Sequence, residues 1–145
     1  MKIDFQKLKD AIQLAQDFHG NQQYGTRGSY IYHLNKVADV AHQQHSGDYT
    51  HMIVAYLHDI LEDTECTYEI ILENFGEEIA EAVSAITKIK DQSYDLYIAR
   101  VVNNPLALKI KIYDTWCNMS ECVVDEDWKR AMKYGKQFNL LVGYK

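Results

Sequence analysis

The residues best suited to chemistry lie together in the segment LHDILEDT, residues 57–64. His58 and Glu62 are four residues apart, as are Asp59 and Asp63, so each pair would lie along one side of a helix. Adjacent His and Asp project about 100° apart, which lets both reach one ion between helices. Ionisable groups on an otherwise apolar helix are costly to bury unless they are paired or bind metal. The segment indicates either a divalent metal site or a solvated acidic helix end, and the second is unfavourable because a helix C-terminus carries partial negative charge.

Two further residues can complete such a site. Asp114 lies in KIKIYDTWCNM, with Asn118 one turn later on the same face. His33 follows Tyr30-Ile31-Tyr32 at the expected start of a helix. Taken alone, Asp114 is better explained as a structural hydrogen-bond acceptor and His33 as a packed, hydrogen-bonded imidazole. The metal interpretation therefore depends on these residues acting together.

The elements that carry these residues are predicted to be helices. Apolar residues recur at helical spacing nearly throughout, and no segment alternates between apolar and polar residues, so we expect no strands. Asp48, Thr67 and Asp91 precede apolar runs and can cap helix starts. Pro105 can open a helix at its first turn. The segment 20–29, GNQQYGTRGS, is expected to be an extended polar loop.

We predict an all-α fold of about seven or eight helices in one compact domain spanning residues 1–145. Helical periodicity and capping residues place the helices over roughly 4–19, 31–45, 49–62, 67–75, 77–89, 92–103, 105–124 and 126–142.

Composition and charge indicate which classes of protein and of partner do not fit this chain. Of 145 residues, 47% are hydrophobic and 25% charged, an ordinary balance for a soluble globular protein. The net charge of -6, without a basic run, argues against nucleic acid as the main partner. The cysteines, Cys66, Cys117 and Cys122, are odd in number and lack CxxC spacing, so free thiols are expected. With no signal-peptide pattern and no long apolar span, we expect a cytoplasmic protein with no membrane partner.

The order of ligand-type residues, H…HD…D over several helices, resembles the HD-domain phosphohydrolase superfamily. More narrowly, the chain resembles the hydrolase domain of RelA/SpoT proteins and the small alarmone hydrolases. The resemblance runs from about His19 to Leu141 and is carried by HGNQQYGTRGSYIYHLNKVA, AYLHDILEDTECT, FGEEIAEAVSAITK and NPLALKIKIYDTWCNM. The acidic pair within one turn of the HD pair makes the match specific. The resemblance implies a single HD-domain helical bundle.

The same resemblance implies roles for individual residues. One metal ion, usually Mn²⁺ in this family, would be held by His33, His58, Asp59 and Asp114. Two imidazoles and two carboxylates suit a borderline octahedral ion of this kind, and other divalent metals are also compatible. Glu62 and Asp63 match the acidic pair that positions or deprotonates the attacking water. Asn118 matches a residue that contacts substrate, and Lys111 corresponds to a frequent lysine ahead of the last aspartate.

The loop before the first ligand departs from the family pattern. Gln23 and Tyr24 stand where relatives carry basic residues, Ser29 stands at a proline position, and Leu34 replaces a common proline. Arg27 is the only cation left in this loop. We expect Arg27 and Tyr24 to contact the substrate, with Tyr24 able to stack on a base. Because the basic residues help hold the purine in relatives, we expect relaxed guanine selectivity.

These observations predict a metal-dependent 3′-pyrophosphohydrolase of an alarmone nucleotide, either ppGpp, pppGpp or ppApp. With no room for a synthetase domain, it is expected only to degrade its substrate. The alternatives are an HD-type nucleoside monophosphatase and a catalytically silent, metal-binding regulatory module. A homodimer is one interpretation of the frequent tyrosines, among them Tyr94, Tyr97, Tyr134 and Tyr144, and core packing is the other.

Overall fold

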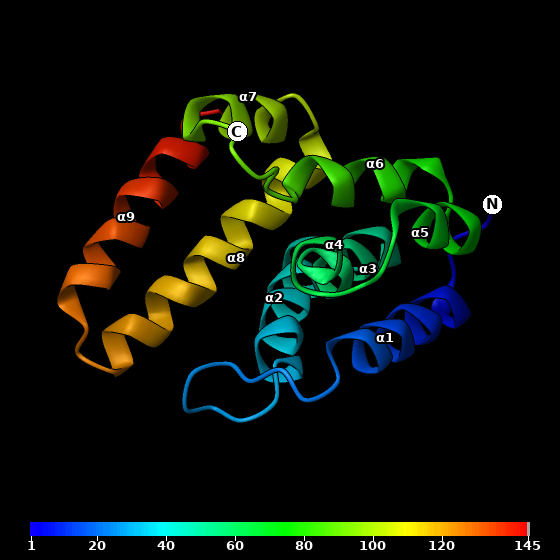
Figure 1. The fold of residues 1–145 in the computed structure, drawn as a ribbon, viewed down its shortest axis with the longest axis horizontal. Coiled ribbons are helices and arrows are strands. Elements are labelled where there is room, and N and C mark those ends of the chain that lie inside the picture. The colour runs from blue at the N-terminus through cyan, green and yellow to red at the C-terminus, as the bar shows by residue number, and fades with distance from the viewer. Residues whose placement is uncertain (145) are drawn as a thin grey trace.

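The computed structural model describes residues 1–144, so the last residue of the predicted domain lies outside the described part. Nine helices and no strands occupy this part, which confirms the all-α prediction (Figure 1). Their bounds are α1 Phe5–His19, α2 Ile31–Gln44, α3 Tyr49–Leu57, α4 Ile60–Asp63, α5 Tyr68–Phe75, α6 Glu77–Ile86, α7 Tyr94–Val102, α8 Pro105–Val124 and α9 Trp128–Val142. None of the described helices is both long and apolar enough to cross a membrane.

Side-chain caps set most helix starts. The Asp48 carboxylate accepts from the backbone N–H of Thr50 at the start of α3, and Pro105 opens α8 as predicted. The predicted cap at Asp91 is wrong. Asp91 adopts a left-handed conformation with φ 64°, and Ser93 caps α7 instead, two residues later.

The predicted helix 49–62 is interrupted at the HD pair. α3 ends at Leu57, and a separate one-turn helix α4 begins at Ile60. Asp59 lies between them with φ -108° and ψ 0°, outside the α-helical region. His58 and Glu62 therefore do not lie along one continuous helix, because the chain bends where the site is built.

Helix ends elsewhere fall a few residues inside the predicted ranges. α6 stops at Ile86 rather than residue 89, and Arg100 of α7 explains the difference. Its guanidinium donates to the carbonyl oxygens of Ser84, Ala85 and Thr87 at 2.7, 3.1 and 2.7 Å. These bonds satisfy carbonyls that a longer helix would have used itself.

Two apolar clusters hold the helices together. The larger unites α1, α2, α3, α5, α6 and α8, with Leu34, Ile53, Leu57 and Ile110 fully buried. The smaller joins α7, α8 and α9 through Tyr97, Ile98, Val101, Leu108, Ile112 and Leu141. α8 contributes to both clusters, and α9 runs back beside it as the second arm of a hairpin (Figure 1).

The loop between α1 and α2 is fastened to α8 through Glu121. This buried carboxylate accepts from Arg27 Nε, Tyr32 Oη and Lys36 Nζ, each at 2.7 Å. Arg27 also donates to Asp125 at 2.7 Å. Burial favours the neutral acid, but the bonds from Lys36, Tyr32 and Arg27 outweigh it and lower the pKa of Glu121 to about 2. The ionised form of Glu121 therefore stabilises the folded loop.

We expect Glu121→Gln to lower the free energy of unfolding at pH 7 by about 2 kcal/mol, the scale of a hydrogen bond to a charged group. Since the folded-state pKa is depressed from 4.5 to about 2, this contribution is complete above pH 4.5 and disappears as the pH falls toward 2. Urea unfolding of both proteins between pH 7 and pH 3 measures the difference. Glu73→Gln, at an exposed position, is the control and should change little. A difference independent of pH would contradict the account.

Candidate functional site

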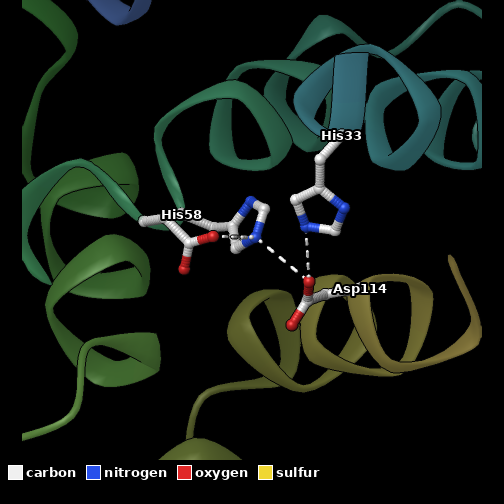
Figure 2. A group of neighbouring side chains, drawn as sticks. His33, His58 and Asp114 are labelled. Atoms are coloured by element: carbon white, nitrogen blue, oxygen red, sulfur yellow. Dashed lines mark hydrogen bonds and ion pairs between the residues drawn. The ribbon is translucent and has the colours of Figure 1, made fainter. Parts of the chain in front are cut away.

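Four ligand-type side chains from separate elements meet at one point. His33 comes from the first turn of α2, His58 from the end of α3, Asp59 from the start of α4 and Asp114 from the middle of α8. Their ligand atoms all lie within 4.8 Å of one another. Figure 2 shows both imidazoles facing the carboxylate of Asp114, whose Oδ1 lies 2.8 Å from His33 Nε2 and 3.3 Å from His58 Nε2.

The electrostatics of this cluster call for a cation. His58 Nδ1 lies 2.6 Å from the carbonyl oxygen of Ala55, and since a carbonyl only accepts, this nitrogen donates. In neutral His58 the lone pair of Nε2 then faces the Asp59 carboxylate at 3.0 Å, and this buried Nε2 makes no hydrogen bond. Two electron-rich groups so close together need a proton or a metal ion between them. The donor set, two imidazoles and two carboxylates, therefore fits a divalent metal.

The pKa shifts of His58 and Asp114 also indicate that the cluster favours a positive charge. Burial lowers the pKa of His58, but the charges of Asp59 and Asp114 outweigh it and hold that pKa well above its usual value. Burial raises the pKa of Asp114, but Lys111 and His58 hold it well below its usual range. The site therefore favours ionised carboxylates and an added positive charge.

Lys111 and Asn118 contact Asp114 from either side along α8. Lys111 Nζ donates to Asp114 Oδ2 at 3.0 Å, and Asn118 Nδ2 donates to Oδ1 at 3.1 Å. The hydroxyl of Tyr24 donates to Asn118 Oδ1 at 2.5 Å. The Tyr24 ring stacks on His33, with centroids 4.7 Å apart and an angle of 8° between planes. Tyr24 therefore supports the cluster directly instead of extending into solvent.

Arg27 lies away from the cluster. Its guanidinium pairs with Glu121 and Asp125, and it lines a second small pocket that includes none of the four clustered residues. The structure thus brings Tyr24, Lys111 and Asn118 to the candidate site but does not bring Arg27 there.

Of the two expected catalytic acids, Glu62 is among the residues that line the cavity beside the cluster and Asp63 is not. The Oε1 of Glu62 accepts from the backbone N–H of Lys88 at 2.9 Å. Asp63 is exposed, and its Oδ2 accepts from Gln22 Nε2 at 3.0 Å. The acids are thus held by the segment after α6 and by the loop after α1.

A cavity of about 150 Å³ is lined by three of the four ligand-type residues, His58, Asp59 and Asp114. Besides predicted residues, its walls contain six that sequence reasoning missed: Ile86, Lys88, Tyr97, Lys133, Tyr134 and Gln137. Three lysines, at positions 88, 111 and 133, line the same cavity as Asp59 and Asp114, and lysine ammonium groups commonly bind phosphate. The four-residue spacing of Lys133 and Gln137 indicates one shared helix face, but no local pattern places that face at the site.

Two of the four tyrosines suggested for a dimer face lie in the core or at the cavity. Tyr97 is 3% exposed and Tyr134 lines the cavity, so core packing and the site account for these two. Tyr94 and Tyr144 are 46% and 54% exposed.

Comparison with known proteins supports the same assignment. A family model described as HD domain matches residues 11–100. A guanosine-3′,5′-bis(diphosphate) 3′-pyrophosphohydrolase of Aquifex aeolicus is 33% identical over 134 residues, covering 86% of this chain and 19% of the relative. The bifunctional (p)ppGpp synthase/hydrolase SpoT of Escherichia coli K12 is 28% identical over 124 residues, covering 78% and 18%. The chain thus spans about a fifth of the length of these relatives.

A solved structure of a metazoan ortholog of SpoT that hydrolyses ppGpp superimposes with a TM-score of 0.76. The alignment covers 95% of this chain and 88% of the other, at 21% identity, and at that identity it shows a shared fold. The HD-domain model covers more than half of the chain and includes His33, His58 and Asp59, while Asp114 lies beyond its end. The chain belongs to the HD-domain family, and its resemblance to RelA/SpoT-type members of that family is confirmed.

Proposed function

We propose that this protein is a divalent-metal phosphohydrolase that removes pyrophosphate from the 3′ position of an alarmone nucleotide such as ppGpp. The observation that carries the proposal is the buried cluster of two imidazoles and two carboxylates bordering a cavity lined by lysines and Glu62. The names of the relatives, 3′-pyrophosphohydrolase and (p)ppGpp synthase/hydrolase, support the substrate class.

The four clustered side chains, His33, His58, Asp59 and Asp114, would hold one ion, and Mn²⁺ suits their mixed nitrogen and oxygen donors. When bound, such an ion neutralises phosphate charge and lowers the pKa of a coordinated water. The protein's own contribution is to fix the donors before the substrate arrives. Tyr24 stacked on His33 and the Ala55 carbonyl bonded to His58 restrict both imidazole rings.

Glu62 is the residue proposed to orient the attacking water or take its proton. Its Oε1 is held by the backbone N–H of Lys88, which leaves Oε2 to accept from a water in the cavity. Lys88, Lys111 and Lys133 would attract the phosphate groups of the substrate, and Asn118 would contact its ribose or phosphate. Asp63 would assist Glu62.

The substrate class can be tested with purified protein supplied with Mn²⁺. We expect hydrolysis of ppGpp with release of pyrophosphate. Release of orthophosphate from nucleoside monophosphates would instead identify a nucleoside monophosphatase, and metal binding without turnover on any nucleotide would identify a regulatory module.

The metal assignment predicts joint loss of metal and activity. His58→Ala and Asp114→Asn should each remove bound Mn²⁺ and abolish hydrolysis, because each removes a ligand from a buried site. Elemental analysis on the assayed samples gives the metal stoichiometry. His42→Ala, an exposed histidine of α2, is the control and should keep both. Chelation by EDTA should lower the melting temperature of the wild type but not of His58→Ala, because an ion bound to the folded state stabilises it by mass action. Stoichiometric metal in either ligand variant would contradict the assignment.

The proposed role of Glu62 predicts that a variant at this position loses activity but retains the metal. Glu62→Gln keeps the size of the side chain and its acceptor for Lys88 N–H but removes the charge. We expect nearly unchanged metal content and a fall in kcat of about a hundredfold or more, the scale for losing a positioned acid or base. Glu65→Gln, an exposed neighbour outside the cavity lining, should retain normal kcat. Loss of the metal, or normal turnover, in Glu62→Gln would exclude this role.

Base selectivity is the third property that the site predicts. Gln23 and Tyr24 replace basic residues of relatives. The Tyr24 ring already stacks on His33, and its hydroxyl already donates to Asn118. With fewer donors for a guanine, we expect kcat/KM for ppGpp and ppApp to differ by less than a hundredfold, or about 2.7 kcal/mol. Parallel assays on both nucleotides measure the ratio, and a larger preference for ppGpp would refute relaxed selectivity.

A further inference from the structure

A buried histidine at the end of α1 is linked to the acidic pair, although neither the metal cluster nor the cavity includes it. His19 is 5% exposed, and its Nδ1 lies 2.8 Å from Gln22 Oε1. Gln22 Nε2 in turn donates to Asp63 Oδ2 at 3.0 Å. The three side chains form a chain of hydrogen bonds from the protein interior to Asp63.

The direction of these bonds follows from chemistry. An ionised carboxylate only accepts, so the amide nitrogen of Gln22 must face Asp63 and its oxygen must face His19. His19 Nδ1 must then carry a proton. His19 Nε2, the other ring nitrogen, is buried without a hydrogen-bond partner, so Nδ1 makes the ring's bond to Gln22.

The backbone fixes Gln22 from both sides. Its N–H donates to the carbonyl of His19 at 2.9 Å, and its own carbonyl accepts from the N–H of Tyr30 at 2.9 Å. The rings of His19 and Tyr30 stack with centroids 5.0 Å apart, and the hydroxyl of Tyr30 donates to Asp59 Oδ2 at 2.5 Å. Gln22 is thus held between His19 and Tyr30, and Tyr30 is hydrogen-bonded to Asp59 of the cluster.

Asp63 has little other support. It is the last residue of α4, a single turn of four residues, and its side chain is exposed. An exposed carboxylate on such a short element would otherwise exchange among rotamers. A fixed amide donor at one oxygen selects one rotamer and leaves the other oxygen, Oδ1, for water.

We propose that Gln22, oriented by His19, is a positioning residue that sets the direction of the Asp63 carboxylate for hydrolysis. The proposal rests on the proposed function in that Asp63 assists the attacking water. The Gln22 side chain makes no hydrogen bond to the four clustered residues and does not line the cavity, so its proposed effect on hydrolysis passes through Asp63.

A double-mutant cycle tests this. Gln22→Met keeps the length of the side chain and removes both hydrogen bonds. We expect unchanged metal content, little change in KM and a fall in kcat of about tenfold, less than the hundredfold typical of losing an acid or base itself. In the Asp63→Asn background, Gln22→Met should cause no further loss, because its effect passes through that carboxylate. The same tenfold loss in both backgrounds would show a general structural role and overturn the proposal.

Gln13→Met is a matched control. Gln13 Nε2 donates to Asp17 Oδ1 at 2.8 Å on the exposed face of α1, so this change removes the same kind of bond away from the site. It should leave kcat, KM and metal content unchanged. A comparable loss of kcat in Gln13→Met would overturn the proposal.

A spectroscopic measurement separates this proposal from the proposed function. In ¹⁵N-labelled wild-type protein, His19 should show a proton on Nδ1, and the side-chain amide signal of Gln22 should move in Asp63→Asn. A proton on Nε2 alone, or an unmoved Gln22 amide, would overturn the linkage whatever the substrate. Absence of ppGpp hydrolysis in the wild type, with the expected ¹⁵N signals present, would refute the proposed function and with it the catalytic purpose of the linkage.

Discussion

Asp114 is an ionised carboxylate with 5% exposure in the interior of a helical protein, and burying an unpaired charge at such a depth costs several kcal/mol. Lys111 of α8 and His33 of α2 provide direct compensation, and His58 at the end of α3 adds to it only when a proton or a cation lies between its Nε2 and the carboxylates. These helices must therefore stay in register for the core to be stable. Lys111 supplies only one positive charge beside two carboxylates, Asp59 and Asp114, so the cluster still favours a further cation. The same requirement for charge balance explains both the packing and the affinity for a metal that we infer.

α8 links the charged cluster to the other parts of the molecule. Lys111, Asp114, Asn118 and Glu121 follow one another at steps of three, four and three residues, so they form one polar stripe along a helix of 20 residues. The middle of the stripe serves the cluster, and its last residue fastens the loop after α1. Positions on other faces, including Leu108 and Ile112, pack against α7 and α9. A single helix thus connects the cluster, the loop that carries Tyr24 and the wall of the cavity.

The sequence was sufficient to predict the fold class, most helices and the meeting of four ligand-type residues, because helical periodicity and residue type are local signals. It was not sufficient for the break between α3 and α4, since the apolar spacing of residues 53–61 continues through the bend. It also gave no sign that Arg27, expected at the substrate, pairs with Glu121, an acid nearly a hundred positions away that no local pattern singles out. Lys133 and Tyr134 were missed for the same reason, because only the packing of α9 on α8 brings them to the cavity.

The acidic pair shows how a site can depend on elements that contribute none of its expected ligands. Glu62 and Asp63 are consecutive, yet they are held by different segments, by the backbone of Lys88 and by the amide of Gln22. A one-turn helix such as α4 is too short to be stable alone, so it cannot define these directions itself. The segment after α6 is fixed in turn by Arg100, which donates to Thr87 O and Gln92 Oε1 in that segment and to the carbonyl oxygens of Ser84 and Ala85 at the end of α6. The orientation of the acids is therefore a property of the two surrounding loops and their anchors, whereas the metal cluster is a property of the helices. The side chains proposed for chemistry and those proposed for metal binding are therefore oriented by different parts of the fold.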